Sequence, residues 1–130
     1  MREREIQEAV DRSTSGAGGG FKLLAADEPP PVFAERREGL SSFVIVVDHA
    51  SARIPRALAN LGLPASELAR HIAWDIGSLG LARMMAAALD APLVAQNYSR
   101  LVIDCNRDPR VETSVAQVSE WITIPGNLEL

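Results

Sequence analysis

The chain has 130 residues, 47% of them hydrophobic, which is enough for one compact core. Its formal net charge is −4, so it lacks the basic surface that binding to nucleic-acid phosphates requires. A single cysteine, Cys105, excludes an intramolecular disulfide and fits a reducing cytoplasm. The sequence shows no signal or transit peptide and no apolar run near the roughly 20 residues that cross a bilayer. We therefore expect a cytoplasmic protein with no nucleic-acid partner and no membrane partner.

Residues 1–20 are expected to form a flexible N-terminal arm. The stretch Ser13–Gly20 contains only serine, threonine, glycine and alanine, which gain too little burial to offset the entropy of ordering the backbone. Glu28–Val32 contains three prolines and is expected to be extended. The folded domain should comprise residues 21–130.

The first regular elements beyond the arm are a strand and a long helix. Phe43–Val47 is an apolar, β-branched run without alternation, which predicts a strand covered on both faces. From Ser66 to Leu89 apolar residues recur at spacings of three and four, which predicts an amphipathic helix with Ser66 as its N-cap. Gly77 and Gly80 are the two points where this helix could break.

Two short apolar runs follow the helix. Pro92–Ala95 and Leu101–Ile103 are both predicted to be strands. The order strand, helix, strand, strand predicts an α/β fold with a mixed, partly parallel sheet flanked by helices. In such folds functional side chains collect at the carboxyl ends of the strands.

Polar residues stand at two places next to these elements. Asp48 and His49 directly follow the first strand, where they could either serve function or simply bond the turn. His71 and Asp75 are spaced i, i+4 and would share a helix face, so they could be either an ordinary surface pair or functional groups.

The last polar group surrounds the third predicted strand. Alternation along that strand would place Arg100, Asp104 and Asn106 on one side. An arginine fork suits recognition of a carboxylate, and the amide of Asn106 could supply a further donor. A purely structural ion pair of arginine with aspartate is the alternative.

Several separated motifs occur in an order and spacing that resemble the N-formylglutamate amidohydrolase family. These motifs are Val46–Ser51, Arg53–Pro55, Leu61–Leu63, His71–Gly77, Tyr98–Arg107 and Ile124–Asn127. The resemblance covers about residues 24–130. It implies a truncated version of the fold of zinc-dependent exopeptidases and an activity that hydrolyses the formamide of N-formyl-L-glutamate or a related N-acyl amino acid.

The resemblance also implies roles for individual residues. His49 would be a ligand of zinc or another divalent metal. Asp48 or Asp75 would orient that histidine, and Asp75 is placed among the catalytic groups. Asn106 and Arg107 would hold a substrate carboxylate. Arg100 would act in catalysis, holding the second carboxylate or the developing oxyanion.

This sequence departs from the family pattern in two ways. Ala52 stands where the family usually has asparagine and where related exopeptidases have a glutamate ligand, and alanine cannot coordinate a metal. The family's later half, which would supply another histidine ligand and an acidic general base, is not present here. We therefore expect weak metal binding and little or no activity of this chain alone. The alternatives are a non-catalytic domain that binds acidic amino acids, and a fragment that does not fold stably.

Overall fold

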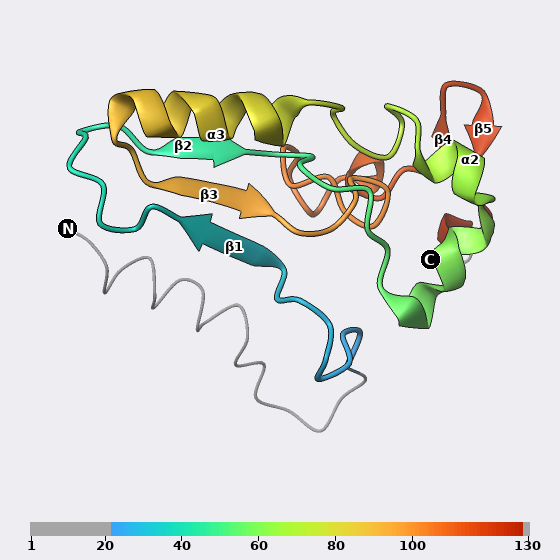
Figure 1. Cartoon of the computed structure of the whole chain (residues 1–130). Coiled ribbons are helices and arrows are strands. Elements are labelled where there is room, and N and C mark those ends of the chain that lie inside the picture. Colours follow the sequence, from blue (N-terminus) through green and yellow to red (C-terminus); the bar gives the residue numbers. More distant parts are fainter. Residues whose placement is uncertain (1–21, 129–130) are drawn as a thin grey trace.

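A computed structural model describes residues 22–128, so the predicted arm of residues 1–20 lies outside the described part (Figure 1). The elements in chain order are β1 (Val32–Glu35), β2 (Ile45–Val47), the 3-10 helix η1 (Arg56–Gly62), α2 (Ala65–Leu68), α3 (Ser78–Leu89), β3 (Leu93–Gln96), η2 (Glu112–Ser114), β4 (Val118–Ser119), β5 (Ile122–Thr123) and η3 (Pro125–Asn127).

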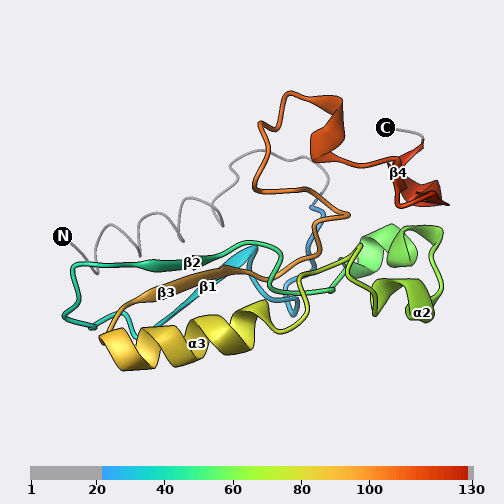
Figure 2. The ribbon, with the colours of Figure 1, turned by 90° about the horizontal axis from the view of Figure 1, so that it is seen from above.

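The larger sheet is mixed, as predicted. Its strand order is β1-β3-β2, with β2 parallel to β3 and β1 antiparallel to β3. The unit β2-α3-β3 places α3 along one face of this sheet (Figures 1 and 2). Small and branched side chains fill the space between them, and the buried members of this core are Val47, Ala50, Ala82, Ala86, Leu93 and Ala95. This unit carries the carboxyl end of β2, from which the candidate site is built.

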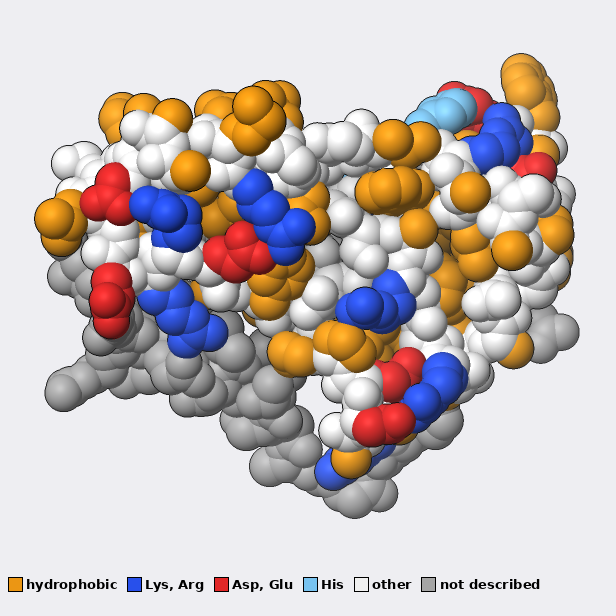
Figure 3. All heavy atoms as spheres, in the orientation of Figure 1, with side chains coloured by type: hydrophobic (Ala, Val, Ile, Leu, Met, Phe, Trp, Pro, Cys, Tyr) orange, Lys and Arg blue, Asp and Glu red, His pale blue; other side chains and the backbone are white. Residues whose placement is uncertain are grey.

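The outer surfaces of this unit carry apolar side chains. Leu81, Met84, Met85 and Leu89 of α3 are exposed, and apolar side chains gather over this helix (Figure 3). On the opposite face of the sheet, Val46 is 68% exposed. The expectation that β2 is covered on both faces is therefore wrong. No helix of the described part combines the length and apolar character needed to cross a bilayer.

A second core joins the segments that flank the candidate site. Its buried members are Leu61, Leu63, Ala73, Leu101 and Ile124. A Cβ atom at Gly126 would lie 2.8 Å from the Cα atom of Leu61, so the turn at η3 packs against η1 at a distance that only glycine allows. The buried Asn127 side chain donates hydrogen bonds to the backbone oxygens of Leu101 and Ala116. The C-terminal turn thereby fixes the segment that carries Leu101.

The predicted helix over residues 66–89 is interrupted in the structure. The short α2 ends at Leu68, and α3 begins at Ser78 after Gly77, whose φ of 84° is left-handed and breaks the helix at one of the two predicted points. Ser66 is not the N-cap: it lies within α2, and Pro64 occupies the N-cap position. Residues 69–77 form turns instead, which bury Ala73 in the second core.

Leu101–Ile103 is not a strand. The Ser99 hydroxyl oxygen accepts the backbone N–H of Leu101 at 3.1 Å, and the Ser99 carbonyl accepts that of Val102 at 3.0 Å. These local bonds satisfy the backbone in a turn, so the segment has no need of a neighbouring strand. Leu101 is apolar because it belongs to the second core, not because it lies in a sheet.

Candidate functional site

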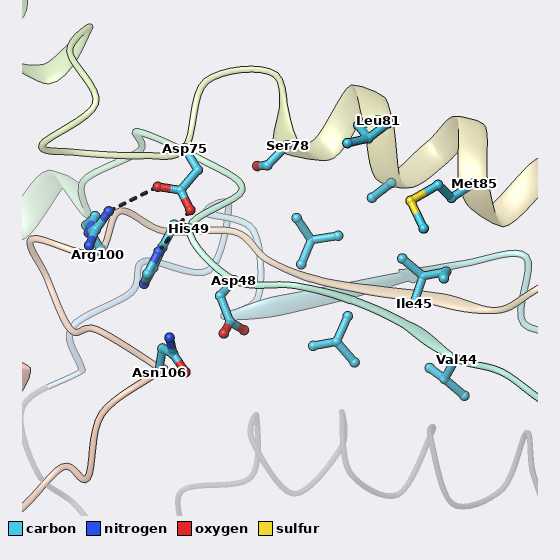
Figure 4. A pocket seen from close by; sticks show the side chains of 13 residues that line it. Val44, Ile45, Asp48, His49, Asp75, Ser78, Leu81, Met85, Arg100 and Asn106 are labelled. Carbon is cyan, nitrogen blue, oxygen red and sulfur yellow. Dashed lines mark hydrogen bonds and ion pairs between the residues drawn. The ribbon is translucent and has the colours of Figure 1, made fainter.

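An open cavity of about 580 Å³ lies beside the carboxyl end of β2 and the start of α3 (Figure 4). Apolar side chains of β2 and α3 line one part of it, and polar side chains from three separate segments line the other. The polar members are Asp48, His49, Asp75, Ser78, Arg100 and Asn106.

His49 is the centre of the polar part. It directly follows β2 and is only 5% exposed. Its φ of 53° is left-handed, an uncommon conformation outside glycine that is typical of functional turns. Its backbone carbonyl accepts the N–H of Asp75 at 2.9 Å, which ties the turn before α3 to the end of β2. The conformation of His49 is thus fixed by both the strand and the neighbouring turn.

Both ring nitrogens of His49 contact carboxylates. Nε2 lies 2.6 Å from Oδ1 of Asp104, and Nδ1 lies 3.3 Å from Oδ2 of Asp75. The two carboxylates differ in environment, because the side chain of Asp75 is 49% exposed and that of Asp104 only 10%. The short, buried contact identifies Asp104 as the acceptor of an Nε2–H bond, and Nδ1 is the nitrogen on the side of the more exposed carboxylate.

Asp104 is held as an anion by several donors. In addition to His49, the backbone N–H of Asn106 donates to its Oδ1 at 3.0 Å and Nε of Arg107 donates to its Oδ2 at 3.2 Å. Burial raises the pKa of this carboxyl, but the hydrogen bonds from His49, Asn106 and Arg107 outweigh burial and bring the pKa below its usual value of 3.8. The carboxylate is therefore ionised at neutral pH and can orient the ring of His49.

The two arginines bind different members of this carboxylate network. Arg100 donates from Nη1 to Oδ1 of Asp75 at 3.0 Å, and its Nη2 lies 4.0 Å from Oδ2 of Asp104. Arg107 binds Asp104 and also Thr113. His49 and Arg107 thus share one carboxylate, and Arg100 lines the cavity of His49 while Arg107 lines a neighbouring one. Their segment is a turn rather than the predicted strand.

Asn106 also lies at the cavity. Its backbone N–H binds Asp104, and its side-chain amide is free to bind a ligand. No hydrogen bond to its side-chain amide is formed within residues 22–128, and this amide lines the cavity. The roles of Asn106 and Arg107 in substrate binding and of Arg100 in catalysis stay predictions; Arg100 and Asn106 line this cavity, whereas Arg107 lines a neighbouring one.

The turn that presents Arg100 is fixed by Ser99. The hydroxyl of Ser99 is fully buried and donates to the backbone oxygen of Ala73 at 2.7 Å, while its backbone N–H donates to the carbonyl of Arg53. These bonds join the Arg100 segment to the turn that carries Asp75. The sequence alone gave no sign of this role, because a serine beside an arginine has no distinctive pattern.

Two expected contacts are not formed. His71 does not pair with Asp75, because residues 69–77 are not helical; its Nε2 lies 2.7 Å from the carboxylate of Glu120 instead. Asp48 makes no contact with the ring of His49, and its carboxylate points to the other side of the end of β2 (Figure 4). Asp75, the second of the two residues expected to orient His49, is the one that touches the ring.

Asp48 instead influences Cys105. Burial by surrounding atoms, followed by the negative charge of Asp48 and a hydrogen bond to it, raises the pKa of the Cys105 thiol to about 11. The thiol donates to the side-chain oxygen of Gln96 at 3.0 Å. Cys105 is therefore protonated at neutral pH and is a poor nucleophile or metal ligand there.

The donor set within residues 22–128 fits only part of a metal site. No cluster of three or more histidine, cysteine, aspartate or glutamate side chains suited to a metal is found in that part of the chain. Ala52 contributes no donor atom and Asp48 does not contact the ring of His49, so His49 and Asp75 are the cavity-lining donors that touch each other. Beside them, the hydroxyl oxygen of Ser78 is buried and has no hydrogen-bond partner among these residues. Two ligand side chains and one orphaned hydroxyl are compatible with a weakly bound divalent cation.

Comparisons with known proteins agree with this picture. The crystal structure of a gene product from Agrobacterium tumefaciens is similar, with 39% sequence identity and a TM-score of 0.81. The similarity covers 84% of this chain and 43% of that one, so this chain spans less than half the length of its structural relative. A search of curated protein sequences gives no significant match. The family model described as N-formylglutamate amidohydrolase matches residues 41–129, a range that contains every polar side chain of the cavity. The chain belongs to the N-formylglutamate amidohydrolase family.

Proposed function

We propose that this chain supplies part of the active site of a metal-dependent amidohydrolase that releases formate, or a related acyl group, from N-acyl derivatives of acidic amino acids. The observation that supports this most directly is the network in which His49, Asp75 and Arg100 line one cavity, with Asp104 bound to the ring of His49. Membership of the family supports amidohydrolase chemistry. The substrate and the metal dependence are our proposals.

The arginines provide the features that an acidic substrate needs. Arg100 uses Nη1 for Asp75 and keeps further N–H donors, so it can bind a carboxylate or a developing oxyanion at the cavity. Arg107 is half-exposed and retains donors beyond those used for Asp104 and Thr113. The free amide of Asn106 adds a neutral donor. A substrate with two carboxylates, such as N-formyl-L-glutamate, would match these cations.

His49 and its two carboxylates provide the chemical part of the site. Asp104 fixes the ring through Nε2, which leaves Nδ1 directed toward Asp75 and the cavity. A divalent metal bound at His49 would supply Lewis-acid activation of water and of the scissile carbonyl. Asp75 is more exposed than Asp104 and so is the carboxylate that a substrate or a water molecule can reach.

Calorimetric titration with N-formyl-L-glutamate tests substrate recognition. We expect binding to the wild-type chain and a loss of about tenfold or more in affinity for Arg100→Ala, because a charge-assisted hydrogen bond contributes about 1.5–3 kcal/mol. The matched control is Arg110→Ala, since Arg110 pairs with Asp108 and lies outside this cavity. Equal affinity of both variants would count against the proposed substrate grip.

A second candidate is a non-catalytic domain that binds acidic amino acids. Ala52 favours it, because the family's usual donor at this position is missing while the arginines and Asn106 are retained. Titration with L-glutamate in the presence of a chelator separates the two functions. Tight, metal-independent binding of glutamate without formate release from N-formyl-L-glutamate would favour this candidate over the hydrolase.

A further inference from the structure

One edge of the larger sheet is formed by β2. The strand order β1-β3-β2 leaves this edge without a neighbouring strand among residues 22–128. Backbone groups of successive residues in a strand point to opposite sides, and the N–H of Ile45 donates toward β3, to the carbonyl of Pro92. Val44 and Val46 therefore direct their N–H and C=O groups outward, where a further strand can pair with them.

This edge carries none of the features by which proteins usually protect an exposed strand. From Gly39 to Val47 the chain has no charged residue and no proline. Residues 43–47 are all aromatic or β-branched, a composition that favours strand pairing. The side chains of Phe43 and Val44 are exposed, as is that of Val46. Both the backbone and the side chains of this edge are thus suited to pairing with a strand of another chain.

The apolar part of the candidate-site cavity lies along the same edge. Its lining combines residues 44–47 with Leu81, Ala82 and Met85 of α3. Leu81 and Met85 are exposed, and in Figure 4 they lie at the end of the cavity away from His49. The groove between β2 and α3 therefore has no charged side chain, so it offers nothing to a highly charged partner such as a nucleic acid. An apolar strand fits this groove and leaves the polar part of the cavity open.

The edge of β2 is complementary to itself. When two copies of β2 run antiparallel about a twofold axis at Ile45, Val44 of each copy lies opposite Val46 of the other. Each of these pairs exchanges two backbone hydrogen bonds, and every residue from 43 to 47 faces an apolar residue. No like charges are brought together, because residues 39–47 carry none.

The helix layer is compatible with the same arrangement. The twofold axis is perpendicular to the sheet, so both copies of α3 lie on one face of a continuous sheet. The exposed side chains of Leu81 and Met85 beside β2 then face those of the other copy. Burial of this apolar surface adds to the backbone pairing along the strands.

We infer that the chain forms a symmetric dimer through the edge of β2, in which a second copy of the chain occupies the apolar groove. The dimer covers the apolar part of each cavity and keeps the polar part accessible. Antiparallel pairing places Ser42 of one copy opposite Asp48 of the other, so each copy also contributes to the wall of its partner's cavity. The inference is independent of the proposed reaction, since the contact needs neither substrate nor metal.

Sedimentation velocity of the whole chain tests the dimer. We expect a dissociation constant of about 1–100 µM, at the weak end of the range for protein–protein interfaces. Val46→Lys should weaken association about tenfold or more, because burial of a valine side chain contributes at least about this factor and a buried lysine would lack a partner. Met84→Lys is the matched control, since Met84 is exposed on α3 without lining the cavity, and its affinity should stay within about threefold of wild type.

Three results would overturn the inference. These are a wild-type chain that stays monomeric up to about 500 µM, equal association of the wild type and Val46→Lys, and species that grow beyond a dimer. Amide hydrogen exchange of the wild type keeps the test independent of variant folding. Exchange at Val44 and Val46 should slow about tenfold or more between dilute and concentrated samples, because pairing protects both N–H groups. Exchange rates at these two amides that do not change with concentration would also overturn it.

Discussion

Replacement of Asp104 by asparagine should destabilise the chain markedly. The carboxylate accepts hydrogen bonds from His49, the backbone of Asn106 and Arg107, at 2.6, 3.0 and 3.2 Å. Asparagine keeps one oxygen for the first two donors but turns an NH₂ group toward the guanidinium of Arg107. Each hydrogen bond to a charged group contributes about 1.5–3 kcal/mol, and breaking a buried ion pair costs about 3–5 kcal/mol. We expect a loss of about 2–4 kcal/mol for Asp104→Asn.

Urea unfolding at pH 7 measures this loss. With a slope of about 2 kcal/mol per molar urea, the midpoint should fall by roughly 1–2 M. Asp108→Asn is the control, since Asp108 makes a surface pair with Arg110 and should change stability by less than about 0.5 kcal/mol. Equal midpoints for the two variants would refute the view that Asp104 is a structural anchor of the site.

The difference between Asp104→Asn and wild type should also depend on pH. The folded-state pKa of Asp104 lies below its ordinary value of 3.8, so this carboxylate contributes stability above that value and loses the contribution as pH falls through the folded pKa. The stability gap should therefore be full at neutral pH and shrink below about pH 4. A gap that does not change between pH 7 and pH 3 would contradict this assignment.

Three further predictions concern the supports of the site. Ser99→Ala should destabilise the chain by about 1–3 kcal/mol in urea unfolding, because it leaves the N–H of Leu101 and the carbonyl of Ala73 without the hydroxyl. Gly126→Ala should cost about 1–3 kcal/mol in the same assay, because the new methyl group would overlap the backbone of Leu61. Alkylation of Cys105 by iodoacetamide at pH 8 should be roughly 100-fold slower than for an ordinary thiol and should accelerate up to about pH 11.

Matched substitutions control these three experiments. Ser66→Ala changes an exposed serine and should shift stability by less than about 0.5 kcal/mol. Gly80→Ala places a methyl group where no atom lies within 4 Å in the first turn of α3, so it should stabilise the chain by about 0.4–1 kcal/mol. Asp48→Asn removes a negative charge beside Cys105 and should accelerate alkylation. A change above about 0.5 kcal/mol in Ser66→Ala, a loss of stability in Gly80→Ala or slower alkylation in Asp48→Asn would contradict the packing and electrostatics described above.

The sequence predicted the parts of the fold that are controlled by local pattern. The cores of β2, β3 and α3 follow from apolar runs and helical spacing, because these residues pack against one another within one β-α-β unit. The antiparallel β1 was not predicted. Its four residues follow a proline-rich stretch and gain their strand conformation only by pairing with β3. Leu101–Ile103 was misassigned because a three-residue apolar run fits a buried turn as well as a strand.

The sequence placed His49 and Asp75 together, whereas most other contacts of the candidate site were not predicted. His49 and the Arg100–Arg107 segment were correctly brought together by family motifs and by their positions next to apolar runs. Helical spacing suggested His71 as a partner of Asp75. The chain forms turns instead of a helix before Gly77, so Asp75 contacts His49 rather than His71. Asp104 was noted as a partner of arginine, yet its bond to the histidine depends on a turn that only the folded chain shows.

Metal-dependent formate release tests the central claim most directly. The chain, in excess over N-formyl-L-glutamate, would be stripped with a chelator and then supplied with Zn²⁺, and formate would be quantified by proton NMR. The account predicts at most slow formate release by this chain alone, with any release appearing only after Zn²⁺ is restored and lost in His49→Ala. Formate release that persists in the chelator or in His49→Ala would contradict the account.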